Sequence, residues 1–269
     1  YWIFPKKLRY ICLFIASYIF YMFWNPKYAL LMATSTVVTF LSGILIEKLK
    51  YKRIVVAFSF IINIAILVFF KYFDFLLQNI NIVLSALNIQ LIEKPFDIVL
   101  PVGISFYTFQ ALSYTIDVYR GEIKSEKNII KYALFVSFFP QLVAGPIERS
   151  KHLLSQIQNM DKIKRFDYQR ITEGLILMLF GYFQKMVIAD RASILVDTVF
   201  NRYYIYNTSE LVLSALLFAV QIYCDFASYS LIAIGTSKIM GIHLMENFNT
   251  PYFARSIKEF WGRWHISLS

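Results

Sequence analysis

The sequence has few charged residues, few cysteines and few histidines. Charged residues make up 16% of its 269 residues, against roughly 25% in an average soluble domain. The two cysteines, Cys12 and Cys224, both lie inside apolar runs, which excludes a disulfide framework and the paired thiolates of a zinc site. No phosphate loop, dinucleotide fingerprint, nucleophile elbow or metalloprotease helix occurs. We therefore expect no bound metal and no bound cofactor.

Apolar residues are abundant. Hydrophobic residues make up 58% and aromatic residues 18% of the chain, and the mean hydropathy is +0.54. A soluble domain of this length could not bury so much apolar surface, so the composition predicts a multi-pass membrane protein. We expect it in the cytoplasmic membrane. The net charge of +10 comes from Lys and Arg between apolar runs, as in cytoplasmic loops, and it does not indicate nucleic-acid binding.

Several apolar runs are long enough, or nearly so, to span a bilayer as helices. No Gly/Ser-rich linker or internal repeat separates them, so we expect a single all-α transmembrane domain over residues 1–269. Tyr1 is not a methionine, and both ends are expected to be cuts in a longer chain. The predicted spans are Tyr10–Trp24, Tyr28–Ile46, Ile54–Tyr72, Ile98–Tyr119, Ile171–Ala189 and Leu211–Met240.

Two segments are expected to lie differently in the bilayer. Residues 74–95 mix Asn with apolar residues at helical spacing, which favours an interfacial amphipathic helix. Residues 132–145 are too short to cross ~30 Å of hydrocarbon, contain Pro140 and have basic loops on both sides. We interpret them as a re-entrant segment, with a short tilted span as the alternative. The positive-inside count then puts Gly241–Ser269 near the cytoplasmic face.

Polar residues within apolar runs are the first candidates for function. Gln221, Asp225 and Ser228 share one face of a helix at i, i+4 and i+7. They would either line a path through the bundle or hold helices together by hydrogen bonds. Asp117 is expected to form a structural ion pair with Arg120, one turn further on.

The second candidate is the cluster FWGRWHISLS at residues 260–269. Arg263, Trp264 and His265 could form an interfacial belt. Alternatively, His265 could act as a general base, because a neutral imidazole can take a hydroxyl proton near pH 7. His152 is expected to be a solvated loop residue, and His243 to cap or pack the end of a span.

These stretches together resemble the membrane-bound O-acyltransferase family, in particular its bacterial alginate and peptidoglycan O-acetylases. The resemblance covers most of the chain after Leu100, in the order of the family. Its motifs are LPVGISFYTFQALSYTIDVYRG (100–121), FFPQLVAGPIER (138–149), KMVIAD (185–190), QIYCDFASYSLIAIG (221–235) and MENFNTPYFARSIKEFWGRWHISLS (245–269). The sequence departs from the family pattern at Leu231, where an acidic residue is frequent, and at Gly262, where Arg is usual.

The resemblance implies a helical bundle around a tunnel. An acetyl group from a cytoplasmic donor, acetyl-CoA, would pass through it toward hydroxyls of an extracytoplasmic polysaccharide, with an extracytoplasmic acetyltransferase as partner. His265 maps onto one of two histidines of the family, and Gln221, Asp225, Ser228 and the Arg263–Trp264 pair would line or brace the tunnel.

The family's main histidine lies beyond Ser269, so we expect a chain that ends there to be inactive by itself. The alternatives are a D-alanyl or lipid O-acyltransferase, or a non-enzymatic transporter or scaffold of the cell envelope.

Overall fold

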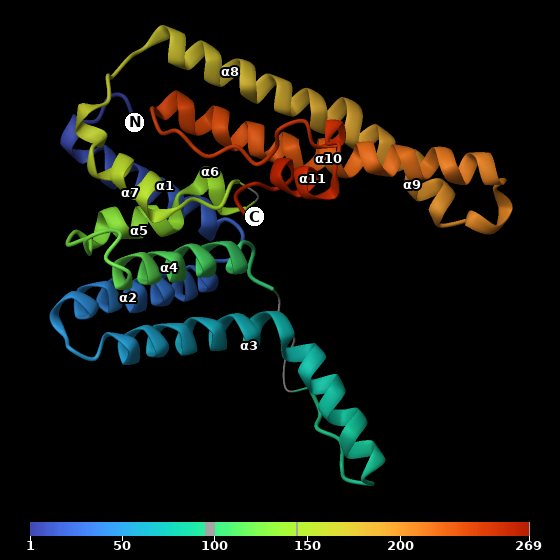
Figure 1. The fold of residues 1–269 in the computed structure, drawn as a ribbon, viewed down its shortest axis with the longest axis horizontal. Coiled ribbons are helices and arrows are strands. Elements are labelled where there is room, and N and C mark those ends of the chain that lie inside the picture. Colours follow the sequence, from blue (N-terminus) through green and yellow to red (C-terminus); the bar gives the residue numbers. More distant parts are fainter. Residues whose placement is uncertain (95–99, 144, 269) are drawn as a thin grey trace. The chain divides into compact units, whose positions relative to one another are not determined.

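A computed structural model describes residues 1–94, 100–143 and 145–268 of the protein (Figure 1). Within those ranges the secondary structure is helical and contains no β-strand, in agreement with the all-α prediction. The principal helices are α1 (Arg9–Met22), α2 (Pro26–Lys48), α3 (Lys52–Ala86), α4 (Ile104–Tyr119), α5 (Ile129–Ser137), α6 (Phe139–Leu142), α7 (Ser150–Gln158), α8 (Tyr168–Phe183), α9 (Asp190–Phe200), α10 (Thr208–Met240) and α11 (Ile257–Arg263). The shorter turns are η1 (Lys6–Leu8), η2 (Met160–Lys162), η4 (Tyr203–Ile205), η5 (Pro251–Phe253) and the π-helix η3 (Gln184–Ala189).

The contacts divide the chain into two compact units. The N-terminal unit comprises Tyr10–Phe139 and Arg149–Gln158, and the C-terminal unit comprises Tyr1–Arg9, Pro140–Glu148 and Asn159–Ser269. The expectation of a single membrane domain stays a prediction, and each unit is described by itself below.

In the N-terminal unit, α2, α3 and α4 pack against one another, and α5 packs on α2 and α7. Several of its interior polar groups form neutral hydrogen bonds between helices. The hydroxyl of Tyr132 donates to Thr39 Oγ1 at 2.7 Å, and Gln110 Nε2 donates to the carbonyl of Phe135 at 2.8 Å. Each bond satisfies a group that would otherwise be buried without a partner, which is the usual way for helices to be held together in an apolar interior.

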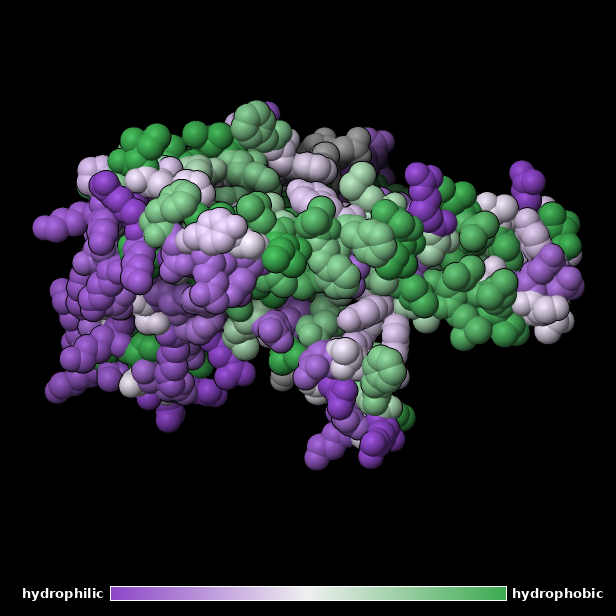
Figure 2. Space-filling view, turned by 90° about the horizontal axis from the view of Figure 1, so that it is seen from above, coloured by the Kyte–Doolittle hydropathy of each residue, from purple (hydrophilic) through white to green (hydrophobic). Residues whose placement is uncertain are grey.

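The C-terminal unit is dominated by a pair of long helices that run side by side (Figure 1). One is the continuous helical stretch Tyr168–Phe200, made of α8, η3 and α9, and the other is α10. Asn207 begins α10 with a capping box to Glu210, and Gly241 ends it with φ +84°, a conformation that favours glycine. Figure 2 shows a largely hydrophobic surface over the middle of this pair and hydrophilic residues toward its ends.

Four helices are long and apolar enough to cross a membrane: α2, α3, Tyr168–Phe200 and α10. They confirm four of the predicted spans, and the chain is a multi-pass membrane protein. The other two predicted spans correspond to shorter helices, since α1 has 14 residues and α4 has 16. The α4 helix begins at Ile104, and the predicted start of that span, residues 98 and 99, lies outside the described residues.

The prediction of a separate interfacial helix over residues 74–95 is wrong in its boundaries. The helix α3 continues from Lys52 to Ala86 without a break, because neither Gly nor Pro interrupts it. The chain then turns through Asn88, whose φ is +53°. Asn81 pairs with the backbone of Ile92 through two hydrogen bonds of 2.9 Å, so residues 89–94 run back along α3 rather than extending a helix. Pro95 lies outside the described residues.

The predicted re-entrant segment, residues 132–145, consists of two short helices with a break between them. The helix α5 ends at Ser137, Phe138 is non-helical, and α6 begins at Phe139. Pro140 lies in the first turn of α6, where a missing N–H is tolerated, but its ring cannot continue the preceding helix. The re-entrant path itself stays a prediction, and Ala144 lies outside the described residues.

The predicted ion pair between Asp117 and Arg120 is wrong. Asp117 accepts a hydrogen bond from the hydroxyl of Ser150, and Arg120 lies 4.0 Å from Glu122 instead. The tertiary fold brings α7 to the end of α4, and a neutral hydroxyl takes the place that the sequence spacing gave to a cation.

Candidate functional site

The long helices of the C-terminal unit approach each other backbone to backbone. Gly174 and Gly181 on α8 face Gly235 and Ser228 on α10. A Cβ atom added to Gly235 would lie 2.5 Å from the carbonyl oxygen of Gly174, closer than any side chain allows. The glycines therefore set the separation of the two helices and bring polar side chains on either side into contact.

A charged triad joins the middles of these helices. Lys185 Nζ lies 2.5 Å from Asp225 Oδ1 and 2.8 Å from Asp190 Oδ1. At 1.5 Å per residue, Lys185 is about 25 Å along the helical stretch from Tyr168, which is about midway along Tyr168–Phe200. About half of each carboxylate side chain remains exposed, 45% for Asp225 and 50% for Asp190. Charged side chains within membrane-spanning helices normally face the interior of the bundle or a water-filled cavity.

The π-helix η3 is what allows Lys185 to bind both carboxylates. The backbone N–H of Asp190 donates to the carbonyl of Lys185, which is the i to i+5 bond that defines a π-turn. In an α-helix, residues five apart point about 140° away from each other, so Lys185 and Asp190 could not pair. The wider turn brings the two side chains onto one face, and π-turns inside α-helices occur frequently at functional sites.

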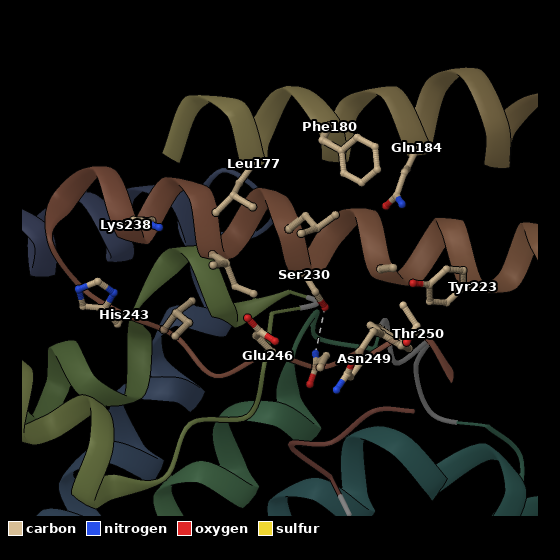
Figure 3. A pocket seen from close by; sticks show the side chains of 16 residues that line it. Leu177, Phe180, Gln184, Tyr223, Ser230, Lys238, His243, Glu246, Asn249 and Thr250 are labelled. Atoms are coloured by element: carbon tan, nitrogen blue, oxygen red, sulfur yellow. Dashed lines mark hydrogen bonds between the residues drawn. The ribbon is translucent and has the colours of Figure 1, made fainter. Parts of the chain in front are cut away.

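A cavity of about 480 Å³ lies beside these helices (Figure 3). Its walls come from α8, the first residue of η3, the C-terminal half of α10 and the segment after it. Apolar residues alternate with amides, a cation and an acid around it. Its lining residues are Leu177, Phe180, Gln184, Tyr223, Ala227, Ser230, Leu231, Ile234, Lys238, His243, Leu244, Glu246, Asn247, Phe248, Asn249 and Thr250.

Two polar contacts fix the shape of this cavity. Asn247 is buried and donates from Nδ2 to Ser230 Oγ at 3.0 Å, which ties the segment after α10 back to the helix (Figure 3). Lys238 lies 2.8 Å from Glu173 on α8. Ligand sites typically combine an apolar wall with a few polar groups in this way.

The predicted cluster at the end of the chain packs on the same face of α10. Phe248 and Trp264 form an isolated antiparallel bridge, and their rings meet edge to face with centroids 5.1 Å apart. Trp264 also stacks on Phe260 at 5.6 Å and lies 6.2 Å from Tyr223 of α10. Two motifs that are about forty residues apart in the sequence therefore form one aromatic cluster in the C-terminal unit.

His265 lies at the edge of this aromatic cluster. Its ring packs edge-on against Phe226 of α10, with centroids 4.8 Å apart, and its backbone has φ +47°, an uncommon conformation outside glycine. Burial lowers the pKa of His265 below its ordinary value of 6.5, because an apolar environment disfavours the imidazolium. The ring is therefore neutral at pH 7, the form that can accept a proton. His265 does not itself line the cavity.

The other predicted site residues lie in distinct positions. The Oε1 atom of Gln221 is buried and has no hydrogen-bond partner among the described residues. The hydroxyl of Ser228 is buried and donates to the backbone carbonyl of Asp225 at 2.7 Å. Arg263 Nη2 lies 2.7 Å from Glu259 Oε1 on the same helix. None of the predicted residues lines the cavity; Asp225 belongs to the triad, and Trp264 and His265 to the aromatic cluster.

Sequence reasoning missed Gln184, Lys185, Lys238 and His243 as parts of one site. The KMVIAD stretch carried a signal, since its Lys and Asp are five residues apart inside an apolar run. Side chains five residues apart point in different directions in an α-helix, and they can pair only in a π-turn. The cavity had no comparable signal, because its residues come from segments that only the fold brings together. No group of three or more potential metal ligands occurs within the described ranges.

Comparison with known proteins identifies relatives of this chain. A family model described as MBOAT, membrane-bound O-acyltransferase family, matches residues 122–269. The chain is 37% identical to the probable alginate O-acetylase AlgI of Pseudomonas aeruginosa over all of its own length and 51% of that protein. It is 34% identical to the peptidoglycan O-acetyltransferase of Helicobacter pylori, over 99% of this chain and 54% of the relative.

A more distant match is the teichoic acid D-alanyltransferase of Bacillus subtilis, at 30% identity over 66% of this chain and 45% of that protein. The chain spans about half the length of the relatives it matches.

Proposed function

Because the chain belongs to the membrane-bound O-acyltransferase family, we propose that the intact protein transfers an acetyl group from a cytoplasmic thioester donor, acetyl-CoA, to hydroxyl groups of an extracytoplasmic polysaccharide. The relatives named as alginate and peptidoglycan O-acetylases match nearly all of the chain, which supports acetyl as the acyl group and a polysaccharide as the acceptor.

The observation that carries this proposal is the position of His265 in the C-terminal unit. Its ring is neutral at pH 7 because of burial, and it packs against Phe226 of α10. Neighbouring residues of α10 and the segment around Phe248 form the wall of a cavity. Such an imidazole can orient the donor or relay a proton as the hydroxyl oxygen attacks the thioester carbonyl. The C–S bond then breaks, and the leaving thiolate takes up the proton that the hydroxyl loses.

The proposal includes a location and a partner. The protein would act in the cytoplasmic membrane, accept its donor at the cytoplasmic face and deliver acetyl through the helical bundle to the far side. An extracytoplasmic acetyltransferase would complete the transfer to the polymer. Gln221, Asp225, Ser228 and the Arg263–Trp264 pair would brace or line this path, and the charged triad near the middles of the two long helices supports a polar route through the unit.

A D-alanyl transferase is the second candidate, because the match to a teichoic acid D-alanyltransferase covers two thirds of the chain. We favour acetyl transfer because the O-acetylases match over a longer part of the chain and at higher identity. Supplying labelled acetyl-CoA or a labelled D-alanyl carrier protein to vesicles containing the intact protein separates the two candidates.

The test of the proposal is His265→Gln in the intact protein, reconstituted in vesicles with radiolabelled acetyl-CoA and an acceptor oligosaccharide. We expect acetyl transfer to fall by about 10²- to 10⁴-fold, the range of a lost acid–base group. His152→Gln, in α7 of the N-terminal unit, is the matched control and should keep the parent rate. Unchanged transfer in His265→Gln would remove His265 from the chemistry, and a parent protein that transports polymer without consuming donor would indicate a transporter.

A further inference from the structure

Gln184 differs from the other polar residues of the cavity. Only 9% of its surface is exposed, and its side chain extends from η3 toward the cavity that it lines (Figure 3). Its Oε1 atom is buried and has no hydrogen-bond partner among the residues that the structure describes. By contrast, Asn247 in the same cavity bonds through both ends of its amide, to Ser230 and Ser267. Gln184 is thus a buried amide whose carbonyl oxygen bonds to none of the described residues.

The burial of Gln184 makes an amide oxygen without a hydrogen-bond partner energetically costly. The cavity wall includes apolar residues such as Phe180 and Leu177 as well as polar ones such as Tyr223, but none of the described residues bonds Oε1 of Gln184. A buried polar atom without a partner destabilises the structure unless something else supplies the bond. A rotation about the last side-chain bond exchanges the oxygen and nitrogen of the amide, so Gln184 can either accept from or donate to a ligand.

The position of Gln184 depends on the π-turn that it begins. Gln184 is the first residue of η3 and Lys185 the second; Gln184 faces the cavity, whereas Lys185 faces the triad. The bonds from Lys185 to Asp190 and to Asp225 close the π-turn from one side. Without them, the five-residue turn would relax toward α-helical geometry, and Gln184 would rotate out of the cavity wall.

We infer that Gln184 binds an uncharged polar group of a substrate in this cavity, and that Lys185, through Asp190 and Asp225, is the positioning residue that holds Gln184 in place. The group is an amide or a hydroxyl. Two substrates of the proposed function could supply it: the amide-containing arm of the thioester donor, and the acceptor sugar. The identity of these substrates rests on the proposed function, whereas the binding role of Gln184 does not.

The first experiment is equilibrium binding to the intact protein in nanodiscs, with radiolabelled acetyl-CoA and a radiolabelled oligosaccharide as separate probes. For Gln184→Leu we expect about 10- to 100-fold weaker binding of one probe, because a site that bonds a polar group loses that much when the bond is lost. Weaker acetyl-CoA binding assigns the donor arm, and weaker oligosaccharide binding assigns the acceptor. Gln169→Leu, on the same helix but outside the cavity, should bind both probes as the parent does. Unchanged binding of both probes by Gln184→Leu would overturn the inference.

The second experiment tests the positioning role of Lys185. Lys185→Met should reproduce the binding loss of Gln184→Leu, the double variant should bind no worse than either single variant, and Lys185→Arg should restore binding. If Lys185→Met does not fold, Asp190→Asn weakens the same turn and replaces it. A Lys185→Met protein of lower thermal stability but unchanged probe affinity would show that Lys185 is structural and would overturn this part.

A turnover measurement separates failure of this inference from failure of the proposed function. If Gln184 bonds the amide of the donor arm, Gln184→Leu should lower turnover of acetyl-CoA but not of ethyl thioacetate, which has no amide. An intact protein that binds a probe through Gln184 but transfers no acetyl would refute the proposed function and leave the binding role of Gln184 standing.

Discussion

The two units satisfy the polar groups of their long helices in different ways. In the N-terminal unit α2 and α3 are joined by neutral hydrogen bonds: Ser35 donates to Asn63 at 2.5 Å, and Asn63 donates to the carbonyl of Ser59 at 2.9 Å. Its ion pairs lie at helix ends, such as Lys127 with Glu47, the penultimate residue of α2, at 2.7 Å.

The C-terminal unit places charge in the middle of its spans. Lys185, Asp190 and Asp225 meet near the middles of the two long helices, and Gln184, which lines the cavity, keeps a buried amide oxygen without a partner among the described residues. Neutral closed bonds hold helices together at little cost. Charges and unused bonding groups are costly there and are characteristic of sites that receive a substrate. This difference in where charge lies supports the proposal that the C-terminal unit carries the chemistry, with the N-terminal unit as scaffold.

The largest expected difference between the units concerns their lysines. Lys185→Leu should lower the free energy of unfolding by about 2–3 kcal/mol, because it leaves Asp190 and Asp225 facing each other without a cation. The two carboxylates are partly exposed, so the loss should be smaller than for a fully buried pair. Lys151→Leu removes a 2.8 Å pair with Glu122 at the surface of the N-terminal unit and should lower the free energy of unfolding only slightly. Denaturation of the intact protein in nanodiscs measures both, and equal effects would contradict the distinction between the units.

A smaller effect is expected from the glycines at helix contacts. Gly235→Ala would bring a Cβ to 2.5 Å from the backbone oxygen of Gly174, and since neither backbone can move without separating the helices we expect a loss of about 1–3 kcal/mol. Gly43→Ala in the N-terminal unit meets the side-chain hydroxyl of Tyr114 at 2.6 Å, and because a side chain can adjust more readily than two packed backbones, its loss should be smaller. Thermal unfolding of the two variants ranks them, and a larger loss for Gly43→Ala would reverse the interpretation.

The smallest effect is a pH dependence that differs between the units. Burial lowers the pKa of His265 below 6.5 in the folded protein, so between that value and 6.5 the unfolded chain binds more protons. The contribution of His265 to stability is therefore complete above pH 6.5 and is lost as pH falls through its folded pKa. In the N-terminal unit, Lys151 lowers the pKa of Glu122 from 4.5, so that contribution is lost only in more acidic solution.

Unfolding measured at about pH 7.5 and about pH 5.5 tests this assignment. The decrease in stability between the two values should be smaller in His265→Gln than in the parent protein. An identical decrease in both proteins would show that other groups control it.

Much of the fold could be predicted from the sequence, and less of the site. The apolar runs predicted α2, α3 and α10. The sequence also indicated Asp225, a charged residue inside one of these runs, as a candidate for function. The partner of Asp225 could not be predicted, because Lys185 lies forty residues away and pairs only through a π-turn. For Asp117 the sequence predicted a partner that the structure does not pair with it. Arg120 is one turn away in the sequence, but Asp117 accepts its hydrogen bond from Ser150, which belongs to a different helix.

The sequence by itself determined the class of the protein, since burying so many apolar residues requires a membrane, and its motifs identified the family. Tertiary structure decided which polar residues act together. Helical periodicity specifies which face a side chain occupies, but not which helix lies opposite that face. The contact of Gly174 with Gly235, the π-turn at Gln184 and the packing of Trp264 on α10 supply that information. They bring Lys185 to Asp225 and turn scattered polar residues into a single candidate site.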